Sequence, residues 1–261
     1  MKISMIVISN RPKNLHRFLN STFILSNIRH MFEIYVLAQY PVTGLEHFLS
    51  ITDNVKIIEP VSAPVPFAYL RRQAMLMAPD SDYFWSLDDD HVFANSNGKT
   101  FSKTCSDYYR EVFEFLENNQ DTGVVTCRGF VGGYSWGYKF VKNPINGLVA
   151  TDKGGIFLKN VGVDKIVSED EGMLVGALFE SLAAYNILSL GYNHIRRYNS
   201  PVKNIPPGKE KHIDGSSNIS YCDETVNANI QGYIRKKFDD PNWTHSSKKY
   251  PKAIAKILGV K

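Results

Sequence analysis

Short apolar runs alternate with helical patterns along the first 90 residues, and this alternation restricts the fold more than any other feature. The apolar, β-rich runs predict strands at residues 2–9, 32–38, 55–58 and 83–87. Helices are expected after Pro12, a residue suited to a first helical turn, and over residues 67–78. Because strands that alternate with helices form βαβ units, we expect an α/β fold with a mainly parallel sheet flanked by helices.

The second half of the chain is richer in glycine and aromatic residues. It predicts a helix over residues 106–118 and a mixed β region with segments at 123–127, 130–140, 148–151 and 156–158. A long helix over about residues 171–190 should end at Gly191, because glycine is common directly after helices. After His194 the chain turns polar and rich in proline and glycine, which predicts a loop-rich C-terminal segment. No repeat or convincing linker interrupts the sequence, so we expect one domain over residues 1–261.

The composition is that of an ordinary globular protein. The 261 residues can bury a sizeable core, and the three cysteines lack the paired spacing of a disulfide framework, as in a reducing compartment. The apolar start at residues 1–8 is too short for a signal peptide. The apolar stretch 172–190 contains Glu180 and Asn186, which a bilayer span disfavours. We therefore expect a soluble cytoplasmic protein.

Three aspartates, Asp88, Asp89 and Asp90, directly follow the strand expected at residues 83–87. Adjacent carboxylates repel one another and lose hydration in a partly closed site, and a bound cation relieves both effects. Asp88 and Asp90 therefore predict a site for Mg²⁺ or Mn²⁺, with positions left for water and phosphate. The alternative is an acidic turn in which an aspartate caps the next segment. The polar loop at residues 9–11 would open onto the same crevice if the two strands are neighbours.

Four motifs occur in order along roughly residues 1–195. They are the strand and loop from Ile3 to Arg11, Leu70-Arg71-Arg72-Gln73-Ala74, Trp85-Ser86-Leu87-Asp88-Asp89-Asp90, and Gly154-Gly155-Ile156-Phe157-Leu158 followed by Ser168-Glu169-Asp170-Glu171. The ordered set resembles the GT-A glycosyltransferase superfamily, the nucleotide-diphospho-sugar transferases. One departure is Gln73, where the family usually has asparagine.

The resemblance implies a Rossmann-like GT-A fold that uses a nucleotide-sugar donor, by default UDP-glucose, together with Mn²⁺ or Mg²⁺. It divides the domain into a nucleotide-sugar-binding half at residues 1–104, an acceptor-side half at 105–200 and a loop-rich basic segment at 201–261. A divalent cation would stabilise the charge of the departing diphosphate, and a carboxylate would accept the proton of the acceptor hydroxyl.

The resemblance also implies roles for individual residues. Donor binding falls to Ser9, Asn10, Arg11, Arg71, Asp88, Asp89, Lys209 and Lys211. Metal binding falls to Asp88, Asp90 and His212. Asp170 is the expected catalytic base and Glu169 the alternative. The plainer interpretation of these two acids, that they favour the first turn of a helix electrostatically, stays open.

Small basic enzymes of this style resemble the TET-associated and phage-type glycosyltransferases that attach sugars to hydroxymethylated pyrimidines in DNA. A DNA acceptor would require the target base to leave the stack. The basic residues that would then track the phosphate backbone are Arg196, Arg197, Lys203, Arg235, Lys236 and Lys237 and the lysines of the C-terminal stretch. Lipid-linked, protein and small glycan acceptors stay open, as does sugar or base stacking on the aromatic run at residues 134–138.

Two other classes of protein fit less well. A nucleotidyltransferase usually carries a glycine-rich basic loop after its first strand, where this chain has Ser9-Asn10-Arg11-Pro12. A non-catalytic nucleic-acid-binding module would account for the basic stretches and the net charge of +4, but not for the acidic triplet.

Overall fold

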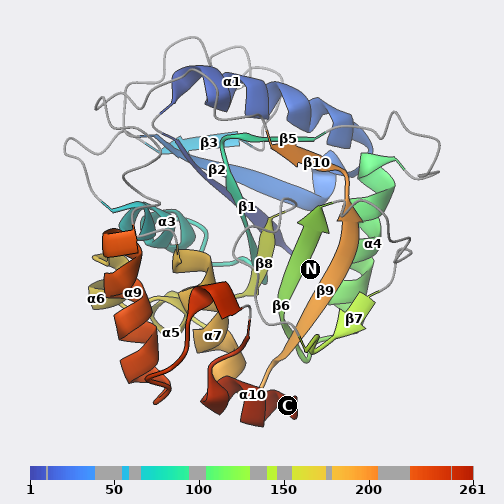
Figure 1. Cartoon of the computed structure of the whole chain (residues 1–261). Helices are drawn as coiled ribbons and strands as arrows, with labels where there is room; N and C mark the ends of the chain where they lie inside the picture. The colour runs from blue at the N-terminus through green and yellow to red at the C-terminus, as the bar shows by residue number, and fades with distance from the viewer. Residues whose placement is uncertain are drawn as a thin grey trace.

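The computed structural model describes residues 1–9, 11–38, 55–58, 66–93, 104–129, 140–145, 155–174, 178–204, 224–247 and 249–260. Within these residues the chain forms an eight-stranded sheet and a separate two-stranded sheet, with helices around them (Figure 1).

The large sheet has the strand order β3-β2-β1-β4-β8-β6-β9-β7. In that order the strands are Val55–Ile58, Phe32–Ala38, Ile3–Ser9, Tyr83–Asp88, Ile156–Lys159, Thr122–Gly129, Asn193–Ser200 and Phe140–Lys142. Strands β3, β2, β1 and β4 are parallel, β8 runs antiparallel to both its neighbours, and β7 is antiparallel to β9. The expected α/β class is confirmed, with four parallel strands on one side and a mixed region beyond them.

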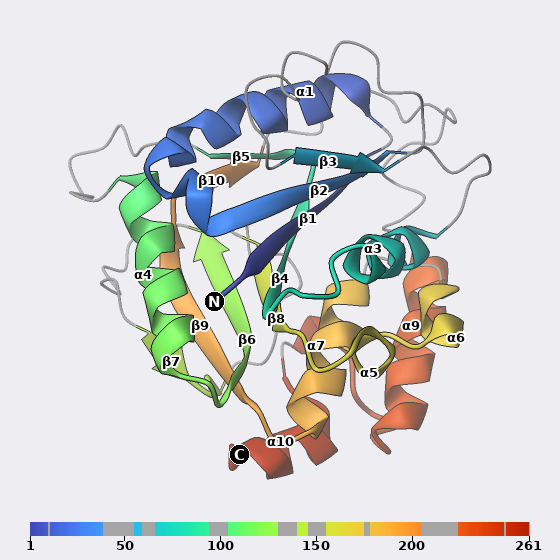
Figure 2. The ribbon, with the colours of Figure 1, turned by 180° about the vertical axis from the view of Figure 1, so that it is seen from behind.

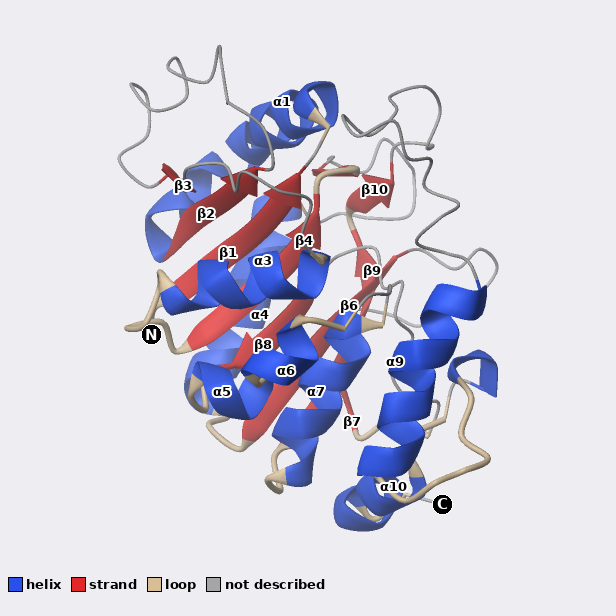
Figure 3. Ribbon diagram, turned by 90° about the vertical axis from the view of Figure 1, so that its left-hand side faces the viewer, coloured by secondary structure: helices blue, strands red, loops and turns tan. Residues whose placement is uncertain are grey.

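The helices lie on both faces of this sheet, as Figures 1 and 2 show from opposite sides. Their bounds are α1 Pro12–Ser21, η1 Thr22–Met31, α3 Phe67–Leu76, α4 Cys105–Asn118, α5 Val163–Ile166, α6 Glu169–Gly172, α7 Phe179–Ser189, α9 Glu224–Lys237, η2 His245–Ser247 and α10 Lys252–Leu258. Helices α3, α5, α6 and α7 lie together in front of the sheet in Figure 3, and α4 lies behind it.

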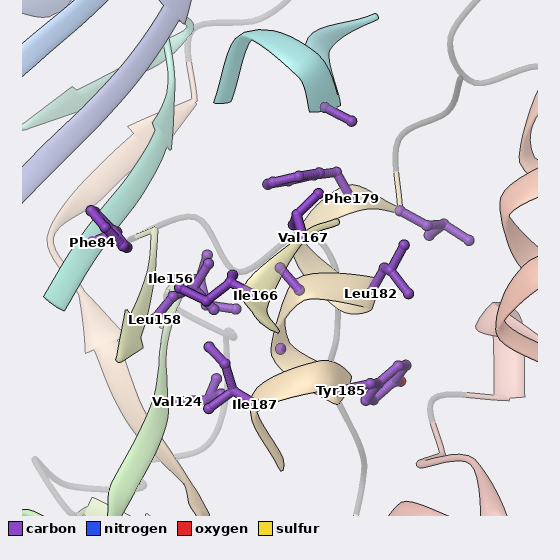
Figure 4. Packing of buried hydrophobic residues seen from close by; sticks show 14 of the residues in the cluster. Phe84, Val124, Ile156, Leu158, Ile166, Val167, Phe179, Leu182, Tyr185 and Ile187 are labelled. Atoms are coloured by element: carbon purple, nitrogen blue, oxygen red, sulfur yellow. The ribbon is translucent and has the colours of Figure 1, made fainter. Parts of the chain in front are cut away.

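Strand β1 shows why both faces must be covered. Alternate residues of a strand point to opposite faces. Met5 and Val7 join a buried cluster with α1, α4 and Trp85, whereas Ile6 and Ile8 join a second cluster with α3, α7, α9 and α10. In the second cluster, Ile166 and Ile187 point toward strand residues such as Leu158 and Val124 (Figure 4). A strand buried on both faces is typical of a parallel sheet between helical layers.

The prediction of one long helix over residues 171–190 is wrong. Two helices stand in its place among the described residues, α6 ending at Gly172 and α7 beginning at Phe179. Gly172 and Gly176 fall within the expected helix, and each glycine disfavours a helix interior by about 1 kcal/mol relative to alanine. Gly191 does follow α7, with a φ of 92° that favours glycine.

The loop-rich expectation for the C-terminal segment is also wrong where the structure describes it. Strand β9 continues to Ser200, β10 (Val202–Asn204) pairs with β5 (His91–Phe93), and α9 and α10 follow. Ile230 and Ile234 of α9 and Phe238 directly after it are spaced four apart and buried, so they lie on one side of this segment. None of the described helices is long and apolar enough to cross a membrane.

Candidate active site

The acidic triplet lies where the sheet brings two strand ends together. Strand β4 is a direct parallel neighbour of β1, with Ile8 opposite Asp88. The loop after β1 and the triplet after β4 therefore share one edge of the sheet, as the sequence predicted for neighbouring strands. Asn10 lies outside the described residues. A pocket at this edge is lined by Ile8, Ser9, Arg11, Phe67, Arg71, Asp88 and Asp89.

Asp89 is held inside the protein. Its side chain is 3% exposed and forms an ion pair with Arg11, whose Nε also donates to Oδ2 at 3.3 Å. The Ser9 hydroxyl donates to the same oxygen at 2.5 Å. Burial raises the pKa of Asp89 to about 6, against the opposing effect of Arg11 and Ser9. Asp89 therefore ties the loop after β1 to the end of β4.

Asp88, Asp90 and His91 present ligand atoms that lie within 4.8 Å of one another. Two carboxylates and an imidazole are ligands that Mn²⁺ accepts. Among the residues the structure describes, Oδ1 of Asp90 is buried and has no hydrogen-bond partner. A buried carboxylate oxygen without a donor is destabilising, and a cation would satisfy it. The donor set therefore fits a divalent metal.

The two outer aspartates differ electrostatically. Loss of hydration by itself raises the pKa of Asp88, but the charge of Arg71, helped by His91 and Arg11, outweighs it and holds that pKa below its usual value. Burial and the negative charge of Asp88 together raise the pKa of Asp90. The nearest basic group to Asp90 is more distant, with Nη2 of Arg11 3.8 Å from Oδ2.

His91 was not among the predicted ligands. The residue is buried at the start of β5, one position after the triplet, and its Nε2 lies 4.0 Å from Asp90 Oδ1. Its position beside the triplet was the available signal, but the sequence interpretation placed the metal histidine in the late basic loop. That predicted ligand, His212, lies outside the described residues, as do Lys209 and Lys211.

Arg71 is a second centre of the site. Its buried guanidinium donates from Nη1 to Ser86 Oγ at 2.5 Å and pairs through Nη2 with Asp88. It also pairs through Nη1 with Glu180. The neighbouring Arg72 instead binds Asp164 and the carbonyl of Val167. One arginine of the pair therefore serves the pocket and the other joins α3 to the segment around α5.

Glu180 is the other residue that the sequence interpretation missed. It lies in the first turn of α7 with a side chain 19% exposed, and Arg71 links it to Asp88. The available signal was an acid in the first turn of a helix that ends before glycine, a weak signal because such acids are common.

The predicted acids at residues 169–171 have other surroundings. Glu171 is 1% exposed, completes a capping box with Ser168, and pairs with Lys237 of α9 at 2.6 Å. Glu169 and Asp170 are exposed. Burial and the charges of Glu171 and Asp170 raise the pKa of Tyr233 in α9 to about 12. Helix α6 also packs against α3, the helix that carries Arg71. The ion pair of Glu171 with Lys237 joins α6 to α9.

The expectation that Arg196 and Arg197 could contact a nucleic-acid backbone is wrong, because both are buried in β9. Arg196 and Arg197 are both 0% exposed. Arg197 pairs with Glu111 and stacks on Phe140 and Tyr108, with ring distances of 4.6 and 5.2 Å. Both arginines are thus part of the interior. The aromatic run at residues 134–138 and Gly154 lie outside the described residues.

Comparisons with known proteins find similar folds among solved structures. No protein-family model and no curated protein matches the chain. Among solved structures, Staphylococcus aureus TarS 1–349 matches with a TM-score of 0.56 and 14% identity, covering 99% of this chain and 71% of that one. Its complex with UDP-GlcNAc matches with a TM-score of 0.54 and 15% identity, covering 99% and 72%.

A mannosyltransferase, PcManGT from Pyrobaculum calidifontis in complex with GDP-Man and Mn²⁺, matches with a TM-score of 0.59 and 14% identity, covering 98% of this chain and 68% of that one. Identities this low establish the fold alone. The chain therefore has the GT-A type of α/β fold, as its sequence motifs implied.

Proposed function

We propose that the protein is a metal-dependent glycosyltransferase that moves a sugar from a nucleotide-diphospho-sugar to a hydroxyl group. The observation that carries the proposal is the Asp88, Asp90 and His91 cluster, in which a buried oxygen of Asp90 has no hydrogen-bond partner within the described part of the chain. The cluster lies beside a pocket at the carboxyl edge of a sheet with this fold. Related folds hold UDP-GlcNAc, or GDP-Man with Mn²⁺.

The donor would bind across the pocket. Phe67 and Ile8 offer apolar surface, and Arg11 and Arg71 offer guanidinium groups suited to phosphate oxygens. Ser9, Asp88 and Asp89 complete the lining that the sequence assigned to the donor. Asn10, Lys209, Lys211 and His212 remain sequence-based candidates for the same role.

The reaction requires one bond to form and one to break. The acceptor oxygen bonds to the anomeric carbon, the bond from that carbon to the diphosphate breaks, and the electron pair stays on the diphosphate. A bound divalent cation supplies Lewis-acid stabilisation of that charge. Arg11 and Arg71 add positive charge at the same edge of the sheet. The acceptor proton passes to a carboxylate of the protein.

We assign that carboxylate to Glu180. Through Arg71 it belongs to the same hydrogen-bonded group as Asp88, and its partial exposure leaves it open to an acceptor. Asp170, the base proposed from sequence, lies instead in α6 beside α9. The two assignments differ in their consequences, since only one of these acids contacts the Arg71 guanidinium.

The proposal is tested by turnover of a panel of UDP- and GDP-sugars with and without Mn²⁺, comparing the unaltered chain with Asp90→Ala. We expect Mn²⁺-dependent release of the nucleoside diphosphate from at least one donor and its loss in the variant. The proposal would be abandoned if no donor in the panel binds or turns over.

The acceptor is a separate question. UDP-glucose is the first donor to test, and hydroxymethylcytosine DNA is the first acceptor, beside glycan, lipid-linked and protein hydroxyls. A DNA acceptor predicts that transfer falls steeply with added salt, because phosphate contacts release counter-ions. Transfer that is independent of salt would direct attention to the other acceptors.

A further inference from the structure

One guanidinium in the pocket serves two carboxylates that belong to different parts of the fold. Asp88 ends strand β4 in the donor-side half, and Glu180 begins α7 in the acceptor-side half. Arg71 of α3 pairs with both through separate nitrogens. We propose that Arg71 is a positioning residue that shares its charge between Asp88 and Glu180, and thereby couples metal binding at Asp88 to the placement of Glu180. The inference rests on the proposed function.

The surroundings of Arg71 keep the guanidinium in place while its partners compete for it. The side chain is only 7% exposed, and Ser86 Oγ accepts from Nη1 at 2.5 Å. The Phe179 ring lies 5.7 Å from the guanidinium carbon. A planar guanidinium offers donors in a fixed fork, so it can hold two carboxylates at once in a geometry that an ammonium cannot reproduce.

The two carboxylates are unequal in their freedom to change partners. The Asp88 side chain is 53% exposed and belongs to the metal cluster, whereas that of Glu180 is 19% exposed. When the charge of Asp88 is drawn toward a divalent cation, Arg71 is left to pair more strongly with Glu180. Metal binding would thus fix the acid that faces the acceptor. Because coupling between sites is reciprocal, losing Glu180 must weaken metal binding.

A neighbouring ion pair provides a matched control. Arg72, the next residue of α3, pairs with Asp164, whose side chain is 79% exposed and which is not part of the metal cluster. Asp164→Asn therefore removes one negative charge from an arginine on the same helix without touching the shared guanidinium.

The test measures Mn²⁺ dissociation constants of the full chain from the electron paramagnetic resonance signal of free Mn²⁺. Glu180→Gln should weaken Mn²⁺ binding about fivefold when Arg71 is present and less than about twofold in an Arg71→Gln background. Fixed charges act on a bound cation additively, so only a shared guanidinium makes the two losses unequal. Asp164→Asn should change the constant by less than about 1.5-fold.

Because Arg71 is buried, Arg71→Lys serves as a second background if the glutamine variant does not fold. The lysine keeps the charge but not the fork, so Glu180→Gln should again have the smaller effect there. Equal losses in the different backgrounds would overturn the inference and leave the proposed metal site standing. Failure of the unaltered chain to bind Mn²⁺ would overturn the metal site and the inference together.

Discussion

Two acidic runs, residues 88–90 and 169–171, lie in contrasting parts of this molecule. Each contains one deeply buried acid with a basic partner: Asp89 pairs with Arg11, and Glu171 pairs with Lys237. The remaining acids differ. Asp90 has a buried oxygen with no hydrogen-bond partner among the described residues, whereas Glu169 and Asp170 are exposed.

The difference follows from the elements that carry the two runs. The first run ends a buried strand, where a neighbouring strand, α3 and α7 bring Ser9, Arg71 and Glu180 close to it. The second run begins a short helix, whose own terminal N–H groups and capping box favour acids there. At the converging strand end, Asp90 therefore keeps a buried oxygen without a hydrogen-bond donor among the described residues, and that oxygen can serve a ligand. At the helix start, the buried acid Glu171 already has a structural role.

The largest effect is expected from Asp90→Asn, which removes the carboxylate charge with little change in shape. Donor turnover at saturating Mn²⁺ should fall by about 10³ in kcat/KM, because several kcal/mol of charge stabilisation is lost. Steady-state release of the nucleoside diphosphate measures it. Unchanged turnover would place the metal elsewhere and remove the contrast between the two runs.

The next effect separates Glu180 from Asp170. Glu180→Gln should reduce kcat for transfer by about 10² or more, as expected when a general base is lost. Asp170→Asn should change it by less than about threefold, because Asp170 is exposed in α6. Transfer assays on both variants decide the assignment. The reverse order of effects would restore the base proposed from sequence.

Glu171→Gln should affect stability rather than chemistry. Burial alone raises the pKa of Glu171, but Lys237, the Ser168 backbone and Asn186 outweigh it and hold the pKa below its usual value. The carboxylate therefore stabilises the fold above its unfolded pKa, and this contribution disappears as the pH falls through the folded pKa. We expect the variant to lose about 1.5 kcal/mol at neutral pH and clearly less at about pH 3.

Urea unfolding of both proteins at the two pH values measures this contribution. A difference that stays constant with pH would mean that the Glu171 charge does not contribute, and that the capping box alone stabilises the start of α6.

The smallest effect is expected at an acid outside both runs. Asp164→Asn removes an exposed ion pair with Arg72 and should change the free energy of unfolding by about 0.5 kcal/mol or less. Thermal unfolding checks it. A larger loss would show that this link to α3 matters more than its exposure indicates.

Much of the fold could be predicted because strand patterns are local. Strands at Phe32–Ala38 and Val55–Ile58 have the predicted bounds, and Tyr83–Asp88 extends its prediction by one residue. The apolar runs of Phe32–Ala38 and Tyr83–Asp88 reflect burial on both faces, which the sequence shows directly. The break between α6 and α7 was harder, since apolar residues continue through it and only glycines mark it.

Part of the site could be predicted because it lies at the ends of strands that local patterns identify. Asp88, Asp90 and the loop after β1 follow strands whose parallel order brings their ends together. Glu180 and Asp88 are 92 positions apart in the numbering and are linked through Arg71. No local pattern shows which of several helix-start acids pairs with Arg71, because that depends on how α7 packs against α3 and the sheet.

We propose a metal bridge, held by Asp88 and Asp90, between the protein and the diphosphate of its nucleotide-sugar donor. It is tested most directly by isothermal titration of UDP, and of GDP, into the chain with and without Mn²⁺, beside Asp90→Asn. We expect Mn²⁺ to lower the dissociation constant of one nucleotide by about tenfold or more in the unaltered chain and not in the variant. Nucleotide affinity that is equal with and without Mn²⁺, or a gain that survives in Asp90→Asn, would contradict it.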